Sequence, residues 1–565
     1  MAIRPIGPGP ETRCIVTPAP APTPPTSGPP DASLTRSWDL ARWTFVAFGA
    51  ALLPVMVMAS FDFGTTWDEK SRHRYGEFIW QFYQGTRPRE AFGETGGHLY
   101  GGLFDVICVA LEQWLPGNRY VIRHVVNATF GWVGVLYCGR LAAQLFGKWA
   151  GVAAMVLLAA SPRYFADSMN NPKDLPFAAM TVMALYYIST VSPRSPYLSW
   201  TTAAKIAVSL ALALNIRVGA LLYVGYLGLL VGALAIIERN TDWRRLANIA
   251  FRLAAVVLAV LLLGTVFWPW AQGAPLWRPF RALLGVANFD FGGTVLFNGR
   301  DYAVSELPWY YAPWWLLIST PPVVIGGALL SMLYSPGRPD TLRRLGLWAI
   351  ALFPIVAAIA MRSTLYDGIR HLLFIYPVVV ALAAAGWTSV IAGHARPWVR
   401  RGAAGLFAAG LASILVFDVR FHPNQAVYFN PLVSGPRGAF AKYDMDYWGN
   451  CVLEAVAWSA TRARALGMPI AISGNPDQLV QLDSERFPEL YFIPPYRGKH
   501  FLHVRLARGP AAGVKELAEQ PALYQVKTAD GVVLCNVIPG PAYSEFEMLQ
   551  SDATRRSASR PAGQP

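Results

Sequence analysis

The 565-residue chain is poor in charge: Asp, Glu, Lys and Arg make up 15% of it, against about 25% in typical soluble proteins. Hydrophobic residues make up 54%, which excludes disorder for most of the chain, because disordered chains have low hydrophobicity and high charge density. Only five cysteines are present, so a disulfide-stapled scaffold is also excluded. The charge that exists is unbalanced, with a net value of +14. Clustered basic residues are typical of nucleic-acid binding, so the position of this excess decides its meaning.

Several catalytic and cofactor motifs are also absent. The sequence has no P-loop, no GxGxxG after a predicted strand, no HExxH and no CxxC. None of the eight histidines forms a pair with metal-ligand spacing. Glu94 and His98 share one predicted loop and are weak candidates for a divalent metal ion. No cofactor is therefore certain from the sequence, and a divalent ion is the one candidate.

Long apolar runs dominate the sequence from Trp43 onward. A helix needs about 20 apolar residues to cross a bilayer, and eleven runs approach or reach that length. They lie at 43–60, 121–146, 149–161, 175–192, 203–216, 218–237, 246–268, 314–333, 345–361, 372–392 and 403–418. The runs at 149–161 and 203–216 are short, which predicts tilted, re-entrant or partly crossing segments. The sequence thus predicts an α-helical polytopic membrane protein with about 11 transmembrane helices.

Basic residues are concentrated in alternate connections between these runs. If the N-terminal segment is cytoplasmic, the connections on that side hold 17 Lys and Arg residues against six Asp and Glu residues, which is +11 of the total +14. Cytoplasmic loops of membrane proteins carry such an excess. The charge therefore indicates orientation and not a nucleic-acid partner, and it predicts that the long connections and the C-terminal part lie on the outer face.

The segments outside the runs suggest a division of the chain. Residues 1–40 are predicted to be a disordered cytoplasmic tail, with ten prolines in the first thirty positions. The transmembrane part is expected at 41–419, with a long outer loop at 61–120. Residues 420–550 are predicted to form a small α/β domain outside the membrane, and 551–565 a second disordered tail.

Within the predicted C-terminal domain, the pattern of apolar residues alternates between helix and strand types. A helix is predicted at 450–466, strands at 469–473 and 500–505, and a hairpin at 525–537. Cys451 and Cys535 would both lie in the oxidising compartment. A disulfide between them is a hypothesis at this point.

The first outer loop begins with two adjacent carboxylates, Asp68 and Glu69. They follow a predicted membrane exit and precede a stretch with apolar residues at helical spacing, which predicts an amphipathic helix on the bilayer surface. The residues with this spacing are Tyr75, Phe78, Ile79 and Phe82. Two interpretations are open: Asp68 caps this helix and Glu69 interacts with its dipole, or a general base stands where a lipid-linked substrate presents its head group.

A second polar motif, SPRYFADSMNNPKDLPFAA at 161–179, follows a short apolar run. Its charged residues are Arg163, Asp167, Lys173 and Asp174. Charges at membrane depth are costly and usually functional or paired. The alternative is an ordinary turn outside the membrane, in which Asp174 caps the next helix, and both can hold for one residue.

The third motif, YDGIRHLLFIYP at 366–377, places Asp367, Arg370 and His371 at the outer mouth of a predicted span. A guanidinium there suits bidentate contact with a phosphate, and the alternative is anchoring to lipid headgroups.

The predicted outer loop at 269–313, with the start of the next run, is rich in Trp and Tyr, which form an interfacial belt or stack on sugar rings. We assign Trp314 and Trp315 to the belt and leave Tyr302, Trp309 and Tyr310 open.

Together, the motifs WDE at 67–69, SPRYFADSMNNPKDLPF and YDGIRH resemble the GT-C superfamily of polytopic membrane glycosyltransferases. The resemblance is greatest to the bacterial branch related to protein O-mannosyltransferases and lipid A aminoarabinose transferases, and it covers residues 43–418. The segment 422–449 is similar to the juncture after the last span in a bacterial subgroup.

This resemblance implies transfer of a sugar from a polyprenyl-phosphate donor to an acceptor hydroxyl on the outer face of a bacterial inner membrane. By position, Asp68 corresponds to the family's base, with Glu69 beside it. With Asp68 as the base, the acceptor hydroxyl would displace the lipid phosphate in a single step, which inverts the anomeric configuration. The second acidic site falls on Asp167 or Asp174. The acceptor (protein, lipid or glycan) stays open.

The residues expected to bind the substrate or its phosphate share a position at the outer membrane edge or in an outer loop. They are Arg163, Lys173, Arg370, His371 and Tyr302.

Two other classes of protein are alternatives. A transporter or flippase of lipid-linked sugars tends to have inverted repeats with broken helices at the bilayer midplane; no repeat is visible here and the charged motifs lie outside. A non-catalytic scaffold is the second alternative. An enzyme requires Asp68, one of the two later aspartates and Arg370 to converge, whereas the alternatives do not.

Overall fold

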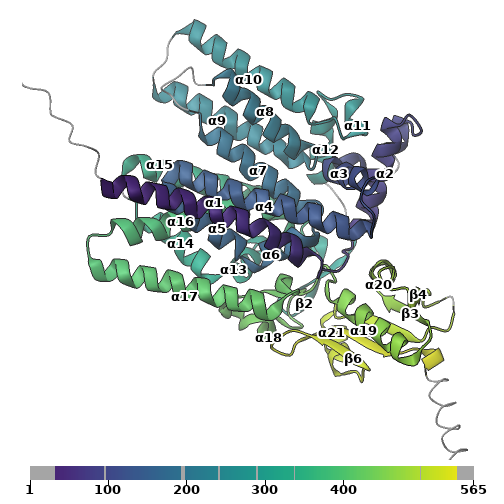
Figure 1. The fold of residues 1–565 in the computed structure, drawn as a ribbon. Helices are drawn as coiled ribbons and strands as arrows, with labels where there is room; N and C mark the ends of the chain where they lie inside the picture. Colours follow the sequence, from purple (N-terminus) through teal and green to yellow (C-terminus); the bar gives the residue numbers. More distant parts are fainter. Residues whose placement is uncertain are drawn as a thin grey trace, which may run out of the picture.

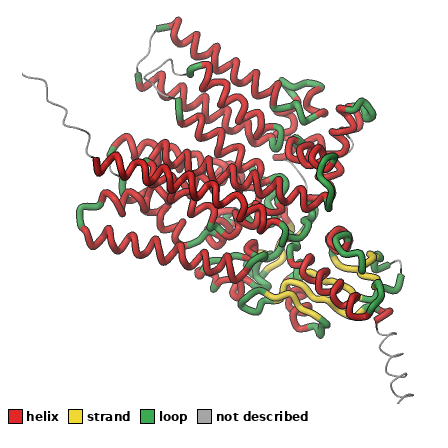
Figure 2. The backbone as a smooth tube through the Cα atoms, in the orientation of Figure 1, coloured by secondary structure: helices red, strands yellow, loops and turns green. Residues whose placement is uncertain are grey.

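The computed structural model of the chain describes residues 32–93, 97–191, 198–238, 242–287, 291–335, 337–496 and 498–543. It consists of a bundle of helices and a small α/β unit, which lies beside the C-terminal ends of α1 and α17 (Figure 1). Figure 2 shows that the strands are confined almost entirely to this unit. The predicted fold class, a polytopic α-helical membrane protein with a small C-terminal α/β domain, is confirmed at this level.

Each of the eleven apolar runs falls on a helix or a helix pair. The helices are α1 (Ala32–Ser60), α4 (Arg119–Phe146), α5 (Lys148–Ala159), α7 (Asp174–Ser189), α8 (Trp200–Leu214), α9 (Leu221–Ile237), α10 (Trp243–Leu263), α13 (Tyr311–Ser319), α14 (Pro322–Leu333), α15 (Arg338–Ala360), α16 (Tyr376–Gly393) and α17 (Pro397–Phe421). Among the described residues, six helices are long and apolar enough to cross a membrane, or eight if each of two bent pairs counts as one span. The number of eleven spans stays a prediction.

Two bends interrupt the helices of the apolar runs, one at the end of the run at 149–161 and one within the run at 314–333. Helix α5 continues into α6 (Pro162–Asn170) at 67°, and α13 continues into α14 at 113°. A proline starts the second helix of each pair, where its missing N–H and its restriction of the preceding residue interrupt the helix. The α5–α6 bend agrees with the irregular segment expected from the short run at 149–161. The sharper bend in the run at 314–333 was not expected.

The first outer loop contains the predicted amphipathic helix, α2 (Glu69–Tyr83), followed by α3 (Leu103–Glu112). Tyr75 and Ile79 of α2 are buried with Phe92 in a small apolar cluster. Other short elements outside the α/β unit are α11 (Pro269–Gln272), α12 (Arg278–Ala287), β1 (Thr294–Phe297), β2 (Arg300–Ala303) and α18 (Gly435–Ala439). Strands β1 and β2 form an antiparallel hairpin.

The C-terminal unit, residues 450–543, carries a five-stranded sheet in the order β4-β3-β5-β7-β6. Its elements are α19 (Cys451–Leu466), β3 (Ile470–Asn475), α20 (Asp477–Ser484), β4 (Leu490–Phe492), β5 (Leu502–Leu506), α21 (Ala511–Glu519), β6 (Tyr524–Lys527) and β7 (Val533–Pro539). Strand β3 is parallel to β4 and β5, and β7 is antiparallel to β5 and β6. The predicted helix, strands and hairpin are confirmed, and the short elements α20, β4 and α21 were missed. A disulfide joins Cys451 of α19 to Cys535 of β7.

The predicted tails lie mostly outside the described residues, namely 1–31 and 544–565. Helix α1 begins at Ala32, so the helix starts before the tail boundary predicted at residue 40.

Candidate active site

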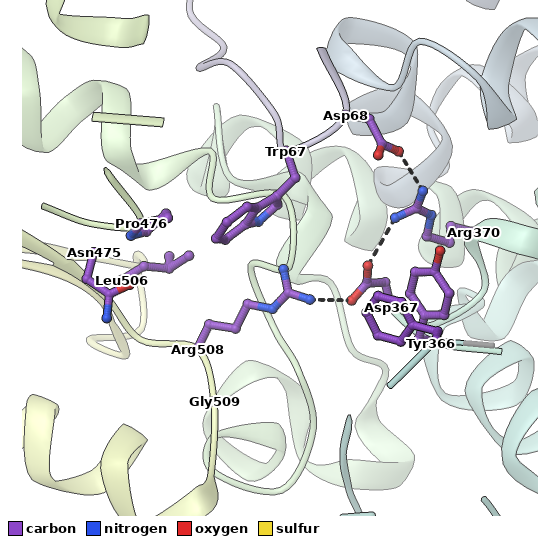
Figure 3. Close-up of a pocket in the computed structure, with 11 residues that line it drawn as sticks. Trp67, Asp68, Tyr366, Asp367, Arg370, Asn475, Pro476, Leu506, Arg508 and Gly509 are labelled. Carbon is purple, nitrogen blue, oxygen red and sulfur yellow. Dashed lines mark hydrogen bonds and ion pairs between the residues drawn. The ribbon is translucent and has the colours of Figure 1, made fainter. Parts of the chain in front are cut away.

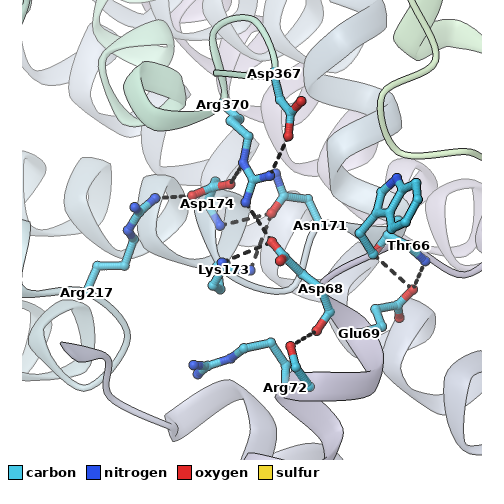
Figure 4. Close-up of polar contacts among 12 residues, drawn as sticks. Thr66, Asp68, Glu69, Arg72, Asn171, Lys173, Asp174, Arg217, Asp367 and Arg370 are labelled. Atoms are coloured by element: carbon cyan, nitrogen blue, oxygen red, sulfur yellow. Dashed lines mark hydrogen bonds and ion pairs between the residues drawn. The ribbon is translucent and has the colours of Figure 1, made fainter. Parts of the chain in front are cut away.

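Arg370 stands at the centre of the polar contacts that the fold brings together (Figure 4). It begins a 3-10 helix, Arg370–Ile375, that leads into α16. Its Nη2 donates to Asp68 at 2.6 Å, its Nε to Asp174 at 3.2 Å and its Nη1 to Asp367 at 3.0 Å. The guanidinium also lies 4.6 Å from the ring centre of Trp448. Three carboxylates from three separate segments therefore fix one buried guanidinium.

A tight turn presents Asp367 to Arg370. Asp367 and Gly368 both have positive φ, 56° and 70°, a region that Asp tolerates better than most residues and that Gly adopts freely. A Cβ at residue 368 would also lie 3.4 Å from the Trp315 ring. The turn folds the Asp367 carboxylate back onto the Arg370 side chain three residues later, so the DGIR sequence supplies both partners of one ion pair.

Asp68 directly precedes α2, but its side chain makes no capping hydrogen bond. Its carboxylate instead pairs with Lys173 Nζ at 3.0 Å and with Arg370 at 2.6 Å, and it is 22% exposed. The interpretation of Asp68 as a helix cap is therefore wrong. Burial raises the pKa of Asp68, but the charges of Lys173 and Arg370 outweigh it and hold this pKa well below its usual range.

The two candidates for the second acidic site have different surroundings. Asp174 contacts Arg370 through one oxygen and Arg217 through the other, and it is buried. It does not cap α7 with its own side chain; its backbone N–H donates to the side chain of Asn171 at 3.0 Å. Asp167 accepts hydrogen bonds from Trp448 Nε1 at 2.9 Å and from Asn171 Nδ2 at 3.1 Å. Only Asp174 of the two is hydrogen-bonded to Arg370 in the described part of the chain.

The ion pairs around Arg370 form one network with a surplus of positive charge. The cations are Lys173, Arg217, Arg370 and Arg508, and the carboxylates are Asp68, Asp174 and Asp367. Four positive charges against three negative ones leave +1 in a mostly buried place. Such a site favours an anionic ligand, because nearby charges are screened less when they are buried.

A cavity of about 380 Å³ opens beside this network, between the membrane bundle and the C-terminal unit (Figure 3). We call it the interface pocket. On the bundle side it is lined by Trp67, Asp68, Phe291, Tyr366, Asp367 and Arg370, and on the side of the C-terminal unit by Asn475, Pro476, Leu506, Arg508 and Gly509. The rings of Phe291 and Tyr366 are stacked, with centres 4.1 Å apart. Its size lies within the range of about 300–1,000 Å³ typical of small-ligand sites.

Glu69 is separated from Asp68 although the two are adjacent in sequence. It is 1% exposed and accepts hydrogen bonds from the backbone N–H of Thr66 at 2.8 Å and from the Thr66 hydroxyl at 3.2 Å. Its carboxylate also lies 3.2 Å from His124 Nε2 and 4.0 Å from Arg123 Nε. It does not line the interface pocket. The structure thus places one carboxylate at the pocket and the other inside the bundle.

Other predicted substrate contacts lie outside the network. Arg163 is buried, with Nε donating to the Tyr428 carbonyl at 3.1 Å and its guanidinium 4.8 Å from the Phe429 ring centre. His371 packs edge-on against Tyr366, with ring centres 4.6 Å apart. Tyr302 lies in the β1–β2 hairpin opposite Val295. None of Arg163, His371 and Tyr302 is among the described residues that line the interface pocket.

The weak metal candidates are not brought to the network either. The His98 carbonyl accepts a hydrogen bond from Trp268 Nε1 at 3.0 Å, and its ring packs edge-on against Trp270. Glu94 lies outside the described residues. Within the described ranges, no group of three or more His, Cys, Asp and Glu side chains could hold a metal ion.

Two network cations were not among the residues selected from the sequence. Arg217 is the one charged residue between Lys205 and Glu238, and an isolated charge between two apolar runs is a recognisable signal. Arg508 stands in a polar segment outside the bundle, where an arginine is ordinary, so its position gave no signal.

A protein-family model matches part of the chain. Residues 116–270 match the family model described as dolichyl-phosphate-mannose-protein mannosyltransferase, a segment that contains Lys173, Asp174 and Arg217. This match confirms, over that segment, the resemblance to the GT-C superfamily of polytopic glycosyltransferases. No curated protein sequence matches the chain.

Solved structures of two proteins are also similar. The crystal structure of ArnT from Cupriavidus metallidurans bound to undecaprenyl phosphate is 15% identical, with 87% of this chain and 97% of that chain covered and a TM-score of 0.46. AglB, the oligosaccharyltransferase from Archaeoglobus fulgidus, in complex with an inhibitory peptide and a dolichol-phosphate, is 12% identical, with 82% and 70% covered and a TM-score of 0.43.

Proposed function

We propose that this protein is a membrane glycosyltransferase that moves a sugar from a polyprenyl-phosphate donor to an acceptor hydroxyl on the outer face of a bacterial inner membrane. The observation that carries the proposal is the contact of Asp68 with Arg370 and Lys173 at the wall of the interface pocket. A carboxylate can take the proton of the acceptor hydroxyl, and two cations can bind the phosphate of a lipid-linked donor. The name of the matched family, a mannosyltransferase that uses dolichyl-phosphate-mannose, supports the same chemistry.

The donor phosphate would bind to Arg370 and Lys173. A guanidinium donates two parallel hydrogen bonds to a phosphate, and an ammonium acts as a point charge. Both cations now contact Asp68, so the phosphate competes with this carboxylate for them. The surplus positive charge of the network attracts the phosphate to these cations.

This exchange would also activate Asp68. A general base works best when its pKa is near the operating pH, whereas the pKa of Asp68 is held low by Lys173 and Arg370. A phosphate that takes up these cations, and brings negative charge of its own, raises the pKa of Asp68. Donor binding would thus create the base that the next step needs.

In the transfer step, the hydroxyl oxygen of the acceptor attacks the anomeric carbon while Asp68 takes the hydroxyl proton. The bond from that carbon to the phosphate oxygen breaks, and the lipid phosphate leaves with the electron pair. A single displacement inverts the anomeric configuration. Arg370 stabilises the negative charge that develops on the phosphate, a contribution of a few kcal/mol in comparable sites, about 2.7–4 kcal/mol for one donor.

The sugar would lie in the interface pocket against its aromatic walls. Trp67 lines one part of it, and the stacked Phe291 and Tyr366 line another. Aromatic side chains with a few polar groups are the usual lining of small-ligand pockets. The pocket volume of about 380 Å³ is sufficient for one sugar ring.

We infer the orientation from the position of this site together with the charge of the segments between the helices. Asp68 lies after the C-terminal end of α1, Arg370 begins the 3-10 helix that leads into α16, and the two side chains meet at the site. The N-terminal segment 1–42 with its four arginines includes the opposite end of α1, and the connection at 393–401 with its three arginines follows the opposite end of α16. With those connections in the cytoplasm, the site and the C-terminal unit lie on the outer, periplasmic side.

The test is incubation of the purified protein with a panel of polyprenyl-phosphate sugars and candidate acceptors, with release of polyprenyl phosphate as the readout. Asp68→Asn should abolish release, while Asp62→Asn, six residues earlier and 60% exposed, should retain it. Full activity of Asp68→Asn would remove this residue from the role of base. Movement of lipid-linked sugars across vesicles without phosphate release would favour the flippase alternative.

A further inference from the structure

One wall of the interface pocket belongs to the C-terminal unit and comes from a particular edge of its sheet. Strands β3 and β5 are parallel neighbours. Asn475 and Pro476 stand at the carboxyl end of β3, and residues 506–509 at the carboxyl end of β5. In α/β sheets, ligand sites form at the carboxyl ends of parallel strands. The sheet edge at the carboxyl ends of β3 and β5, where α/β units bind ligands, therefore faces the bundle.

Arg508 extends from this edge into the network of the bundle (Figure 3). Its Nη2 donates to Asp367 Oδ1 at 2.7 Å, and its Nη1 donates to the Tyr447 carbonyl at 2.9 Å. The guanidinium lies 5.3 Å from the ring centre of Trp67. Two hydrogen bonds and a ring thus hold this side chain, which is 27% exposed.

Asp367 joins Arg508 to Arg370. It is 6% exposed; one oxygen accepts from Arg508 and the other from Arg370 Nη1 at 3.0 Å. A carboxylate between two guanidiniums has its position fixed from both sides. If Arg508 were absent, Asp367 would keep one anchor, on a turn whose backbone has positive φ at two successive residues.

We propose that Arg508 is a positioning residue of the transfer site: through Asp367 it holds the Arg370 guanidinium in the orientation in which it meets Asp68 and the leaving phosphate. The C-terminal unit is then a part of the active site and not an appendage. The assignment of the phosphate rests on the proposed function, whereas the placement of the 366–370 turn by Arg508 does not.

The kinetic test compares the rate of polyprenyl-phosphate release at saturating donor in Arg508→Gln, Arg508→Lys, Asp367→Asn and the double variant. A misplacement of about 1 Å can cost about 10²-fold in rate, so we expect a loss of that order in Arg508→Gln, a smaller change in donor KM, and partial rescue by Arg508→Lys. If Arg508 acts through Asp367, Arg508→Gln should cost nothing more in the Asp367→Asn background. A further tenfold loss in the double variant would overturn the proposal.

A second readout does not depend on turnover. Amide hydrogen exchange of residues 365–372 should be faster in Arg508→Gln than in the wild type. Arg505→Gln is the matched control, because Arg505 lies on β5, the strand that Arg508 follows, and donates to Gln520 at 2.7 Å, outside the pocket. Unchanged exchange in Arg508→Gln would overturn the proposal even if no donor is found. Faster exchange in a protein that turns over no donor would retain the positioning and reject the proposed function instead.

Discussion

Arg370 donates a 2.6 Å hydrogen bond to Asp68, a residue 302 positions earlier in the chain. The pair places a cation that can bind a phosphate against a carboxylate that can accept a proton. In the free protein each group neutralises the other, so neither is available for chemistry. A ligand that binds to the cation must displace the carboxylate, and this competition leads to a direct prediction.

Asp68→Asn should bind undecaprenyl phosphate at least as tightly as the wild type, because the competing negative charge is gone. Arg370→Gln should bind it more weakly by tenfold or more, since a hydrogen bond to a charged group contributes about 1.5–3 kcal/mol. Affinity can be measured by titration of the lipid into protein in nanodiscs. Weaker binding by Asp68→Asn would contradict the competition between carboxylate and phosphate.

Substitutions of Asp167 and Asp174 should have different effects on donor binding. Asp174→Asn removes one carboxylate partner from Arg370 and from Arg217, so donor affinity and turnover should both change. Asp167→Asn leaves every ion pair of Arg370 in place and should lower thermal stability while donor affinity stays within about threefold. For Asp174→Asn, removal of one partner of a buried ion pair costs about 3–5 kcal/mol, and Asp167→Asn changes the acceptor of the hydrogen bonds from Trp448 and Asn171, so both variants must be compared at a temperature where each is folded.

Glu69 should prove structural. Glu69→Gln removes a buried charge from its contacts with His124 and Arg123, and we expect a clear fall in the thermal midpoint. Turnover per folded molecule should remain close to that of the wild type, because Glu69 does not line the interface pocket. A folded Glu69→Gln protein without activity would instead return Glu69 to the catalytic residues.

Asp444 should make stability fall as pH rises. Burial raises the pKa of Asp444 to about 7, whereas an unfolded Asp releases its proton near about 3.9. Between these values the folded protein holds a proton that the unfolded chain has lost, so the free energy of unfolding decreases with pH. The effect amounts to at most about 4 kcal/mol above pH 7.

Asp444→Asn should remove this dependence. The amide oxygen can still accept the hydrogen bond from the Leu296 backbone N–H that Asp444 accepts at 3.2 Å. Thermal midpoints at pH 5 and pH 8 provide the measurement, and the variant should gain relative to the wild type at pH 8. An equal difference between the two proteins at both pH values would show that Asp444 titrates normally.

The membrane helices and the three polar motifs could be predicted because apolar length and misplaced charge are strong local signals. Each of the eleven runs is helical, and Asp68, Lys173, Asp174 and Arg370 lie in one network. The sequence could not separate Asp167 from Asp174. They share one short motif, and only the direction of each side chain relative to Arg370 distinguishes them.

Other features depended on contacts that leave no trace in a local pattern. Glu69 stands beside Asp68 in sequence, yet the start of α2 directs the two carboxylates to different surroundings. Arg508 lies in a polar segment outside the membrane helices, where a charged residue is ordinary and indicates no site. The bend of 113° between α13 and α14 occurs in a run that has the length of a single span, so hydropathy alone concealed it.

The loop ahead of Asp68 is held by the C-terminal unit: the Gly64 backbone N–H donates to Asn450 at 2.9 Å, and Thr65 donates to Asp483 from 418 positions away. At about 5–20 residues per second, a ribosome makes Asp483 roughly 20–80 s after Thr65. During that interval the helices can enter the membrane while the loop lacks its anchor. Asp68 and Arg370 would therefore be fixed only after Asp483 has been made, and a shorter nascent chain would hold no assembled site.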